Sequence, residues 1–206
     1  ANAHSAYTTT HFNLFRVESG GLAEHRHSVQ TPPGPGVPLP EEGGPQLVTG
    51  ATGPAQLALL GSADPRLAQN KQRVFDMWRE VVDAGHQELA SRYLDASFVE
   101  RSPAGAAGRE GFSARFSRPV GPVKAAIDLP VVALVAERDL VVLVTMREHP
   151  HPVRKGMTYT TTWFDTWRFV DGKADEHWDP ATLPTGPAPQ AAAPASGDAL
   201  VQRFAD

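Results

Sequence analysis

The stretch Tyr159-Thr-Thr-Thr-Trp-Phe-Asp-Thr-Trp-Arg-Phe-Val-Asp-Gly-Lys-Ala-Asp-Glu-His-Trp-Asp179 lies near the C-terminal end of the chain and predicts a β-hairpin. Asp171-Gly172 stands between its two arms and is a favoured hairpin turn. The arms carry three Trp, two Phe, one His and two candidate catalytic Asp. Because aromatic and titratable side chains are densest here, we look for a functional site on this hairpin.

Two loops fit this turn, and they place different side chains opposite one another. A two-residue loop at Asp171-Gly172 sets Asp165 opposite Trp178. A three-residue loop that includes Val170 sets Asp165 opposite His177. We favour the three-residue loop, which predicts one face with Trp163, Asp165, Trp167, Asp175, His177 and Asp179, and another with Phe164, Thr166, Arg168, Ala174, Glu176 and Trp178. Either the first face lines a pocket and forms an acid/base site, or it is convex and its polar groups are solvated.

The beginning of the chain repeats this hairpin at a constant offset of 152 residues. The nine identities are Tyr7, Thr8, Thr9, Thr10, Phe12, Arg16, Gly20, Glu24 and His25, which recur from Tyr159 to His177. We interpret residues 1–30 as the hairpin remnant of a first copy of the same domain. Ser19 occupies the position of Asp171 and tolerates a positive φ poorly, which is the reason for favouring the three-residue loop.

The remnant differs from the C-terminal hairpin at the candidate site. His11, Asn13, Phe15, His25 and His27 stand where the later copy has Trp163, Asp165, Trp167, His177 and Asp179. With both carboxylates absent, we expect no equivalent acid/base chemistry there, and the three His are only a weak metal signal. The remnant has little apolar area, so we expect it to extend a sheet of this domain or of a partner chain.

The remaining sequence predicts one domain of residues 64–183, preceded by a Pro/Gly-rich linker (31–63) and followed by an Ala/Pro-rich tail (184–206). Asp64-Pro65 is a helix start and Gly85 a helix stop. Shorter helices are expected over residues 87–93 and 108–116, and buried antiparallel strands over 125–136 and 140–147. This order predicts an α+β fold in which a curved antiparallel sheet wraps the N-terminal helices and leaves a cone-shaped pocket.

Composition narrows the class of partner. The 206 residues are 41% hydrophobic and carry a net charge of −4, which gives no electrostatic footprint for nucleic acid. Cys is absent, so disulfides and thiolate chemistry are excluded. The sequence has no apolar run of the roughly 18 residues that a membrane span requires, and no signal-like N-terminus. We therefore expect a cytoplasmic protein that binds a small molecule or another protein, without nucleic acid or membrane.

The hairpin Phe164–Asp179 resembles the closing hairpin of SnoaL-like polyketide cyclases, in the nuclear-transport-factor-2-like superfamily. The segments Tyr93–Pro103 and Gly108–Phe112 precede it in the order expected for that family, and the resemblance covers roughly residues 67–183. It implies the cone-shaped α+β fold described above, with an extra N-terminal β-hairpin. It also implies a homodimer, no metal and no organic cofactor.

The resemblance further implies a polyketide cyclase-like lyase or isomerase that acts on a hydrophobic, polyketide-like small molecule of secondary metabolism. Aldol-type cyclisation, isomerisation and dehydration are all compatible with it. The alternative is a non-catalytic small-molecule-binding or dimerisation module of the same superfamily.

The family's roles fall on residues that were singled out above. Asp179 is the expected acid/base, with Asp165 and His177 as its partners. The expected substrate-binding residues are Trp163, Trp167, Trp78, Tyr93 and Arg101. Many relatives have His-Asn-Pro where this chain has Arg101-Ser102-Pro103, so an arginine that could hold an anionic or enolate oxygen replaces a pocket histidine.

Overall fold

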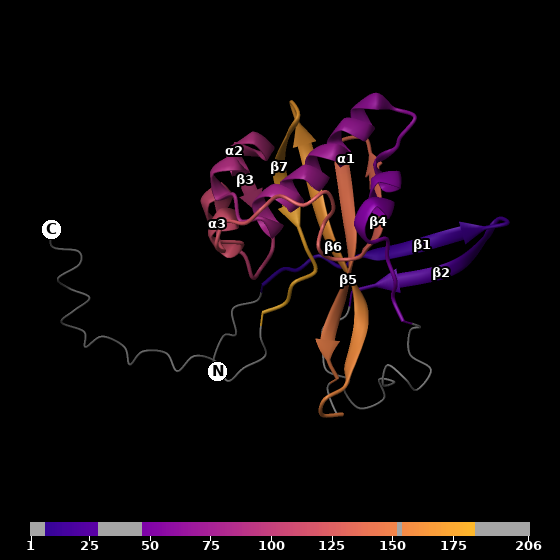
Figure 1. Ribbon diagram of the computed structural model, residues 1–206. Helices are drawn as coiled ribbons and strands as arrows, with labels where there is room; N and C mark the ends of the chain where they lie inside the picture. The colour runs from indigo at the N-terminus through magenta and orange to yellow at the C-terminus, as the bar shows by residue number, and fades with distance from the viewer. Residues whose placement is uncertain (1–6, 29–46, 152–153, 184–206) are drawn as a thin grey trace, which may run out of the picture.

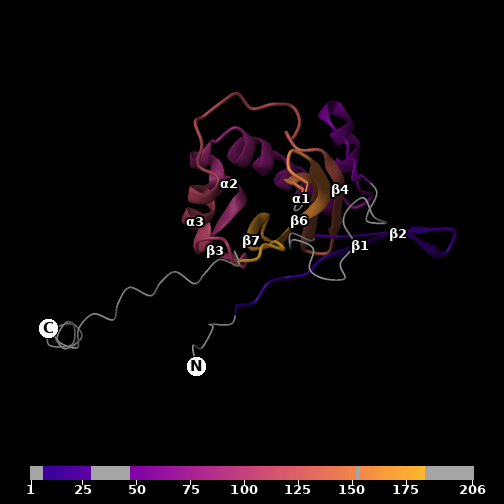
Figure 2. The same ribbon diagram turned by 90° about the horizontal axis from the view of Figure 1, so that it is seen from below.

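The computed structural model describes residues 7–28, 47–151 and 154–183 (Figure 1). The tail expected at 184–206 and most of the expected linker lie outside these residues. Helices lie on one face of a five-stranded sheet, and a separate two-stranded hairpin projects from the other side (Figures 1 and 2). None of the described helices is long and apolar enough to cross a membrane.

The main helix begins and ends where the sequence predicts. Helix α1 (Pro65–Met77) starts after Asp64, whose carboxylate accepts a hydrogen bond from the backbone N–H of Arg66 at 2.8 Å. It continues as the π-helical turn η2 (Trp78–Asp83), and Gly85 follows with a φ of +78°. The short elements η3 (Gln87–Leu89) and α2 (Ala90–Tyr93) and helix α3 (Gly108–Arg115) complete the helical layer.

The sheet has the strand order β3-β7-β6-β5-β4. Its strands are β3 (Leu94–Glu100), β4 (Val131–Glu137), β5 (Leu140–Pro150), β6 (Thr158–Val170) and β7 (Lys173–Trp178). Strand β3 runs parallel to β7, and the other neighbours are antiparallel. Strand β4 begins at Val131, so the expected strand over residues 125–136 was too long at its N-terminal end.

The turn of the β6–β7 hairpin corrects the expected loop. Val170 pairs with Lys173, and Asp171 and Gly172 have φ values of +48° and +78°, so the loop has two residues and not three. A bulge follows, because Phe169 pairs with Ala174 while Arg168 pairs with Glu176. The bulge shifts the register by one residue and sets Trp167 opposite His177, a pairing that neither expected loop contained.

This register keeps Trp163, Asp165, Trp167, His177 and Asp179 together, as expected, but exchanges two neighbours. Ala174 belongs to the buried core, whereas Asp175 lies in the bulge and forms an ion pair with Arg168 at 2.6 Å. The prediction was wrong for both residues, because it did not include the bulge.

The N-terminal hairpin has the same local structure. Strands β1 (Asn13–Glu18) and β2 (Gly21–His27) are joined by Ser19 and Gly20, whose φ values are +50° and +79°. Its register shifts between Arg16 and Val17, which is the same position as the shift in β6 when the offset of 152 is applied. The two hairpins therefore share their turn and their bulge as well as nine residues.

The N-terminal hairpin does not join the five-stranded sheet. It forms a sheet of its own and docks at its base, where Phe12 stacks on Phe164 of β6 with ring centroids 5.4 Å apart. Thr162 Oγ1 donates to the carbonyl of His27 at 3.1 Å, and Thr9 Oγ1 donates to the carbonyl of Ala181 at 2.7 Å. The expectation that the hairpin extends a sheet of this domain was wrong, and pairing with a partner chain stays a prediction.

Part of the expected linker packs on the domain. The 3-10 helix η1 (Gly53–Leu60) buries Gln56, whose amide nitrogen donates to the carbonyls of Ile127 and Leu129 at 3.0 Å each. Its amide oxygen accepts from the backbone N–H of Ile127 at 2.8 Å. Ala51 also forms an isolated bridge with Val131 at the start of β4. Residues 47–63 therefore fix the loop before β4 instead of serving as a free linker.

Candidate active site

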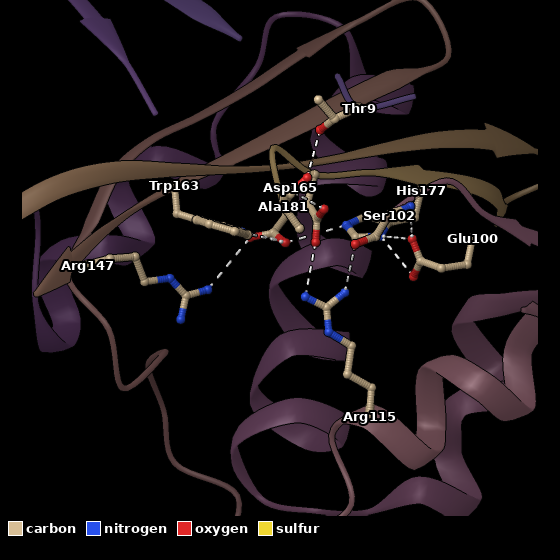
Figure 3. A network of polar contacts seen from close by, with 10 residues as sticks. Thr9, Glu100, Ser102, Arg115, Arg147, Trp163, Asp165, His177 and Ala181 are labelled. Atoms are coloured by element: carbon tan, nitrogen blue, oxygen red, sulfur yellow. Dashed lines mark hydrogen bonds and ion pairs between the residues drawn. The ribbon is translucent and has the colours of Figure 1, made fainter. Parts of the chain in front are cut away.

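A fully buried imidazole forms the centre of the site. His177 of β7 lies beside Glu100, the last residue of β3, because the two residues pair across the parallel strands. Its Nδ1 donates to the Glu100 carboxylate, with distances of 2.9 and 3.1 Å to the two oxygens (Figure 3). The ring of Trp167 stacks on the imidazole at a centroid distance of 4.0 Å. Strand pairing and stacking therefore fix the position of this ring.

The second nitrogen of His177 faces another carboxylate. Nε2 lies 3.4 Å from Oδ1 of Asp165, which is 3% exposed. Burial lowers the pKa of His177, but the hydrogen bonds with Asp165 and Glu100 outweigh burial and raise the pKa to about 9. A carboxylate on each side of the ring explains this preference for the imidazolium form.

The two oxygens of Asp165 have different surroundings. Oδ1 accepts from Trp163 Nε1 at 3.4 Å and lies next to His177, whereas Oδ2 is buried without a hydrogen-bond partner among the described residues. The nearest cation to Oδ2 is NH2 of Arg147, at 3.9 Å. Asp165 therefore has one supported oxygen and one that is free to accept a proton.

Both oxygens of Asp179 are already engaged. Oδ2 accepts from Arg115 NH2 at 3.1 Å, and Oδ1 accepts from the backbone N–H of Ala181 at 3.1 Å (Figure 3). Arg115 also donates to Ser102 Oγ at 3.3 Å. Asp179, which is 1% exposed, therefore anchors Arg115 and the end of α3 to the sheet.

A cavity of about 460 Å³ is lined by residues of η2, the end of α3 and the segment after it, the loop before β4, and one residue of β5. Arg115 and Arg147 line it, and each also contacts one of the two buried carboxylates, so Asp165 and Asp179 lie directly behind its wall. The other lining residues are Trp78, Val82, Asp83, Phe116, Ser117, Arg118, Asp128 and Leu129. Aromatic and charged groups thus meet at the inner end of the cavity.

Asp165, His177 and Asp179 are also the only group among the described residues whose ligand atoms lie close enough for one metal ion, within 4.8 Å of one another. The charges of the group are already balanced, because Glu100, Asp165 and Asp179 face the His177 imidazolium and the guanidinium groups of two arginines. A divalent ion would have to displace the proton of His177. The donor set therefore fits the proton better than a metal.

Comparison with known proteins gives structural matches only. A scan against family models and a search of curated proteins give no match. One similar structure is a protein of Jannaschia sp. CCS1 that is assigned to the SnoaL-like polyketide cyclases. Its identity is 16%, the match covers 58% of this chain and 89% of the other, and the TM-score is 0.43.

Two further structures also resemble this chain. TsrD from Streptomyces laurentii shares 21% identity over 57% of this chain and 90% of its own, with a TM-score of 0.37. An LEH-like epoxide hydrolase of M. tuberculosis shares 9% identity over 56% of this chain and 84% of its own, with a TM-score of 0.40.

The substrate-binding residues expected from the sequence lie in different places. Trp78 lines the cavity, and Trp163 contacts Asp165 at its inner end. Trp167 is fully buried beneath His177, and Tyr93 is a core residue whose hydroxyl donates to Glu80 at 2.6 Å. These last two residues are therefore structural supports rather than pocket walls.

Arg101 was placed in the pocket by the sequence, and the structure places it elsewhere. Its guanidinium is about half exposed and forms an ion pair at 2.5 Å with Glu176, whose side chain lies on the opposite face from His177. The alternation of a strand explains this, because Phe98 and Glu100 share the inner face and Arg101 follows on the outer one.

Three site residues were missed by sequence reasoning: Glu100, Arg115 and Arg147. The same alternation could have found Glu100, since it lies two residues after the buried Phe98. Arg115 lies three residues after the buried Phe112 on α3, which is helical spacing toward the same face. Arg147 is on the inner face of β5 because it is four residues after the buried Leu143.

Proposed function

We propose that this protein is a SnoaL-like enzyme that uses cofactor-independent acid/base chemistry on a hydrophobic, polyketide-like small molecule. The proposed step is removal of a proton from a carbon next to a carbonyl, followed by aldol-type cyclisation, isomerisation or dehydration. The observation that carries it is the buried carboxylate of Asp165, which has one free oxygen behind the cavity wall and a protonated imidazole beside the other oxygen.

The hydrogen bonds favour Asp165 over Asp179 as the base. Asp179 accepts hydrogen bonds at both oxygens, whereas Oδ2 of Asp165 accepts none from the described residues. We therefore assign proton removal to Asp165 and give Asp179 a supporting role as the anchor of Arg115. This reverses the roles expected from the family resemblance.

The step balances within these groups. Oδ2 of Asp165 takes the proton, the electrons of the C–H bond form the enolate double bond, and the carbonyl electrons move to oxygen. Returning the proton to another carbon completes an isomerisation. In a cyclisation, the enolate carbon attacks a second carbonyl, and the resulting alkoxide takes the proton from Asp165. In a dehydration, the enolate expels hydroxide from the neighbouring carbon, and it leaves as water with the proton from Asp165. The His177 imidazolium lies beside Oδ1, with its Nε2 at 3.4 Å, and its positive charge faces the carboxylate throughout the step.

Hydrogen–deuterium exchange at carbon tests this proposal without knowledge of the natural substrate. We expect the wild-type protein to accelerate exchange of the protons next to the carbonyl of 2-tetralone in D₂O, as followed by NMR. Asp165→Asn should reduce the acceleration by roughly 10²- to 10⁴-fold, the usual contribution of a general base. Asp179→Asn should have a smaller effect, because it removes only the anchor of Arg115.

The control is Asp95→Asn, a half-buried carboxylate on β3 whose hydrogen bonds among the described residues go to Ser97, and it should leave exchange unchanged. Equal rates for the wild type and for buffer would refute the acid/base proposal and would favour the alternative of a binding module. A greater loss in Asp179→Asn than in Asp165→Asn would return the base to Asp179.

A further inference from the structure

The cavity contains three arginines, and the partners of their guanidinium groups differ. Arg118 donates to the carbonyls of Val82 and Asp83 at 3.2 and 3.0 Å. Arg115 is held by Ser102 and Asp179. Two of the three lining cations are therefore held by hydrogen bonds to the protein.

Arg147 makes no hydrogen bond with the described part of the chain. Its Nε is buried without a partner, and its nearest carboxylate oxygen, Oδ2 of Asp165, is 3.9 Å away. Its side chain is 29% exposed and lines the cavity, and its two terminal nitrogens form no hydrogen bond with the described residues, so they can donate to a bound molecule. Trp78, which also lines the cavity, likewise has a buried Nε1 without a described partner.

Aromatic rings hold the free guanidinium in place. Its carbon lies 5.9 Å from the ring centre of Trp78 on the helical side and 5.7 Å from that of Trp163 on the sheet side. These cation–π contacts position the group without using its N–H donors. A flat, conjugated ligand would fit beside such rings, and an acceptor oxygen at this end would meet the Arg147 guanidinium, whereas the lining carboxylates Asp83 and Asp128 come from other segments.

We propose that Arg147 is a substrate-positioning residue that binds an anionic oxygen, an enolate or carboxylate, of a flat conjugated substrate. The proposal rests on the proposed function, because the same contact would stabilise the enolate formed when Asp165 removes a proton. It adds the substrate class: an aromatic or conjugated molecule that carries, or develops, a negative charge next to its ring system.

A matched pair of small probes tests this at equilibrium. The probes are 2-naphthoate and its neutral counterpart 2-naphthamide, with binding to the full chain measured by calorimetry at pH 7. We expect wild type to bind the naphthoate about 10- to 100-fold more tightly, the effect of a charge-assisted hydrogen bond. Arg147→Met should bring the two affinities within about twofold, and Arg147→Lys, which keeps the charge, should retain part of the preference.

Arg118→Met is the matched control, because it removes from the same cavity a positive charge that is bonded to the carbonyls of Val82 and Asp83, and it should keep the preference. Equal binding of the two probes by the wild type, no naphthoate binding up to about 10 mM, or an unchanged preference in Arg147→Met would each overturn the proposal. Asp165→Asn separates it from the proposed function, since this variant should lose proton exchange but keep its preference for the anion.

Discussion

The charge of His177 links its own strand, β7, to the two neighbouring strands, because Glu100 lies on β3 and Asp165 on β6. Its imidazolium lies between Glu100 and Asp165, and all three side chains are at least 96% buried. Removing one member of such a group leaves a buried charge without its partner, which commonly costs 3–5 kcal/mol. The protonation state of this one ring should therefore affect the stability of the whole domain.

The first residue-scale prediction concerns pH. The folded-state pKa of His177 is about 9, above its ordinary value of 6.5. Its contribution to stability is therefore fully present below pH 6.5, declines between pH 6.5 and 9, and is lost above that range. Thermal unfolding followed by circular dichroism from pH 6 to 10 should show this decline in the wild type and a flatter profile in His177→Gln.

The control for this experiment is His86→Gln, since His86 bonds to the largely exposed Glu88 at 2.8 Å and should leave the wild-type profile unchanged. The same decline in His177→Gln as in the wild type would contradict the assignment of the pH dependence to this ring.

Also at the scale of single residues, the sequence predicted which residues of β6 and β7 share the site better than it predicted the residues from other segments that contact them. Asp165, His177 and Asp179 share one face because strand alternation fixes it within a hairpin. The roles of the two carboxylates could not be predicted, because they depend on Arg115 and Ala181, which come from other segments. Arg147 contributes through donors that lack partners, and sequence patterns do not show that.

The two hairpin turns adopt a conformation that the residue at their first position does not favour. Asp171 and Ser19 both have a positive φ, although neither is glycine. The sequence argument took this cost as decisive and therefore favoured the wrong loop, and it also omitted the bulge that follows each turn. Arg168 bonds to Asp175 in the bulge at 3.0 and 2.6 Å and to the adjacent Glu176 at 2.9 Å, which stabilises the shifted register.

The glycines of these turns give a matched pair of variants at the scale of single elements. Gly172 and Gly20 have nearly the same φ, +78° and +79°, but a Cβ on Gly172 would lie 3.1 Å from Arg73, whereas one on Gly20 would meet nothing within 4 Å. Gly172→Ala should lower the free energy of unfolding by about 1–2 kcal/mol, as for a non-glycine residue in the left-handed region. Chemical denaturation measures this value.

Gly20→Ala should change the same free energy by less than about 0.5 kcal/mol, because its hairpin lies outside the five-stranded sheet. Equal losses in the two variants would mean that the N-terminal hairpin unfolds together with the domain, contrary to this expectation.

For the whole molecule, the helix–strand order predicted the α+β architecture, and the period of the apolar residues predicted most elements within a few positions. The docking of residues 47–63 was missed because Gln56 acts through its amide, which no hydrophobic pattern shows. The position of the N-terminal hairpin was missed for a related reason. Its similarity to β6 and β7 indicated a sheet, but not which surface it would contact.

Because the N-terminal hairpin lies outside the five-stranded sheet, its amides should exchange hydrogen quickly. The apolar residues of β1 and β2 are exposed, with Val17 at 63% and Leu22 at 71%, whereas their counterparts Phe169 and Ala174 are buried. A two-stranded hairpin is marginally stable by itself. Its amides should exchange at least about 100-fold faster than those at the centre of β5 and β6, as measured by NMR or mass spectrometry.

Equal protection in the two sheets would contradict the independence of the hairpin. Protection that rises with protein concentration would instead show that a second chain pairs with β1 or β2, as the sequence allowed.

The stack of Phe12 on Phe164 brings together two residues that occupy the same position in the two hairpins. It covers the outer face of β6, where Phe164 is only 2% exposed although the helices lie on the other side. A second protein that approached this face would compete with the chain's own N-terminal segment. Association there is therefore an exchange reaction, in which the incoming surface must replace Phe12 and the hydrogen bonds of Thr9 and Thr162 before it gains contacts of its own.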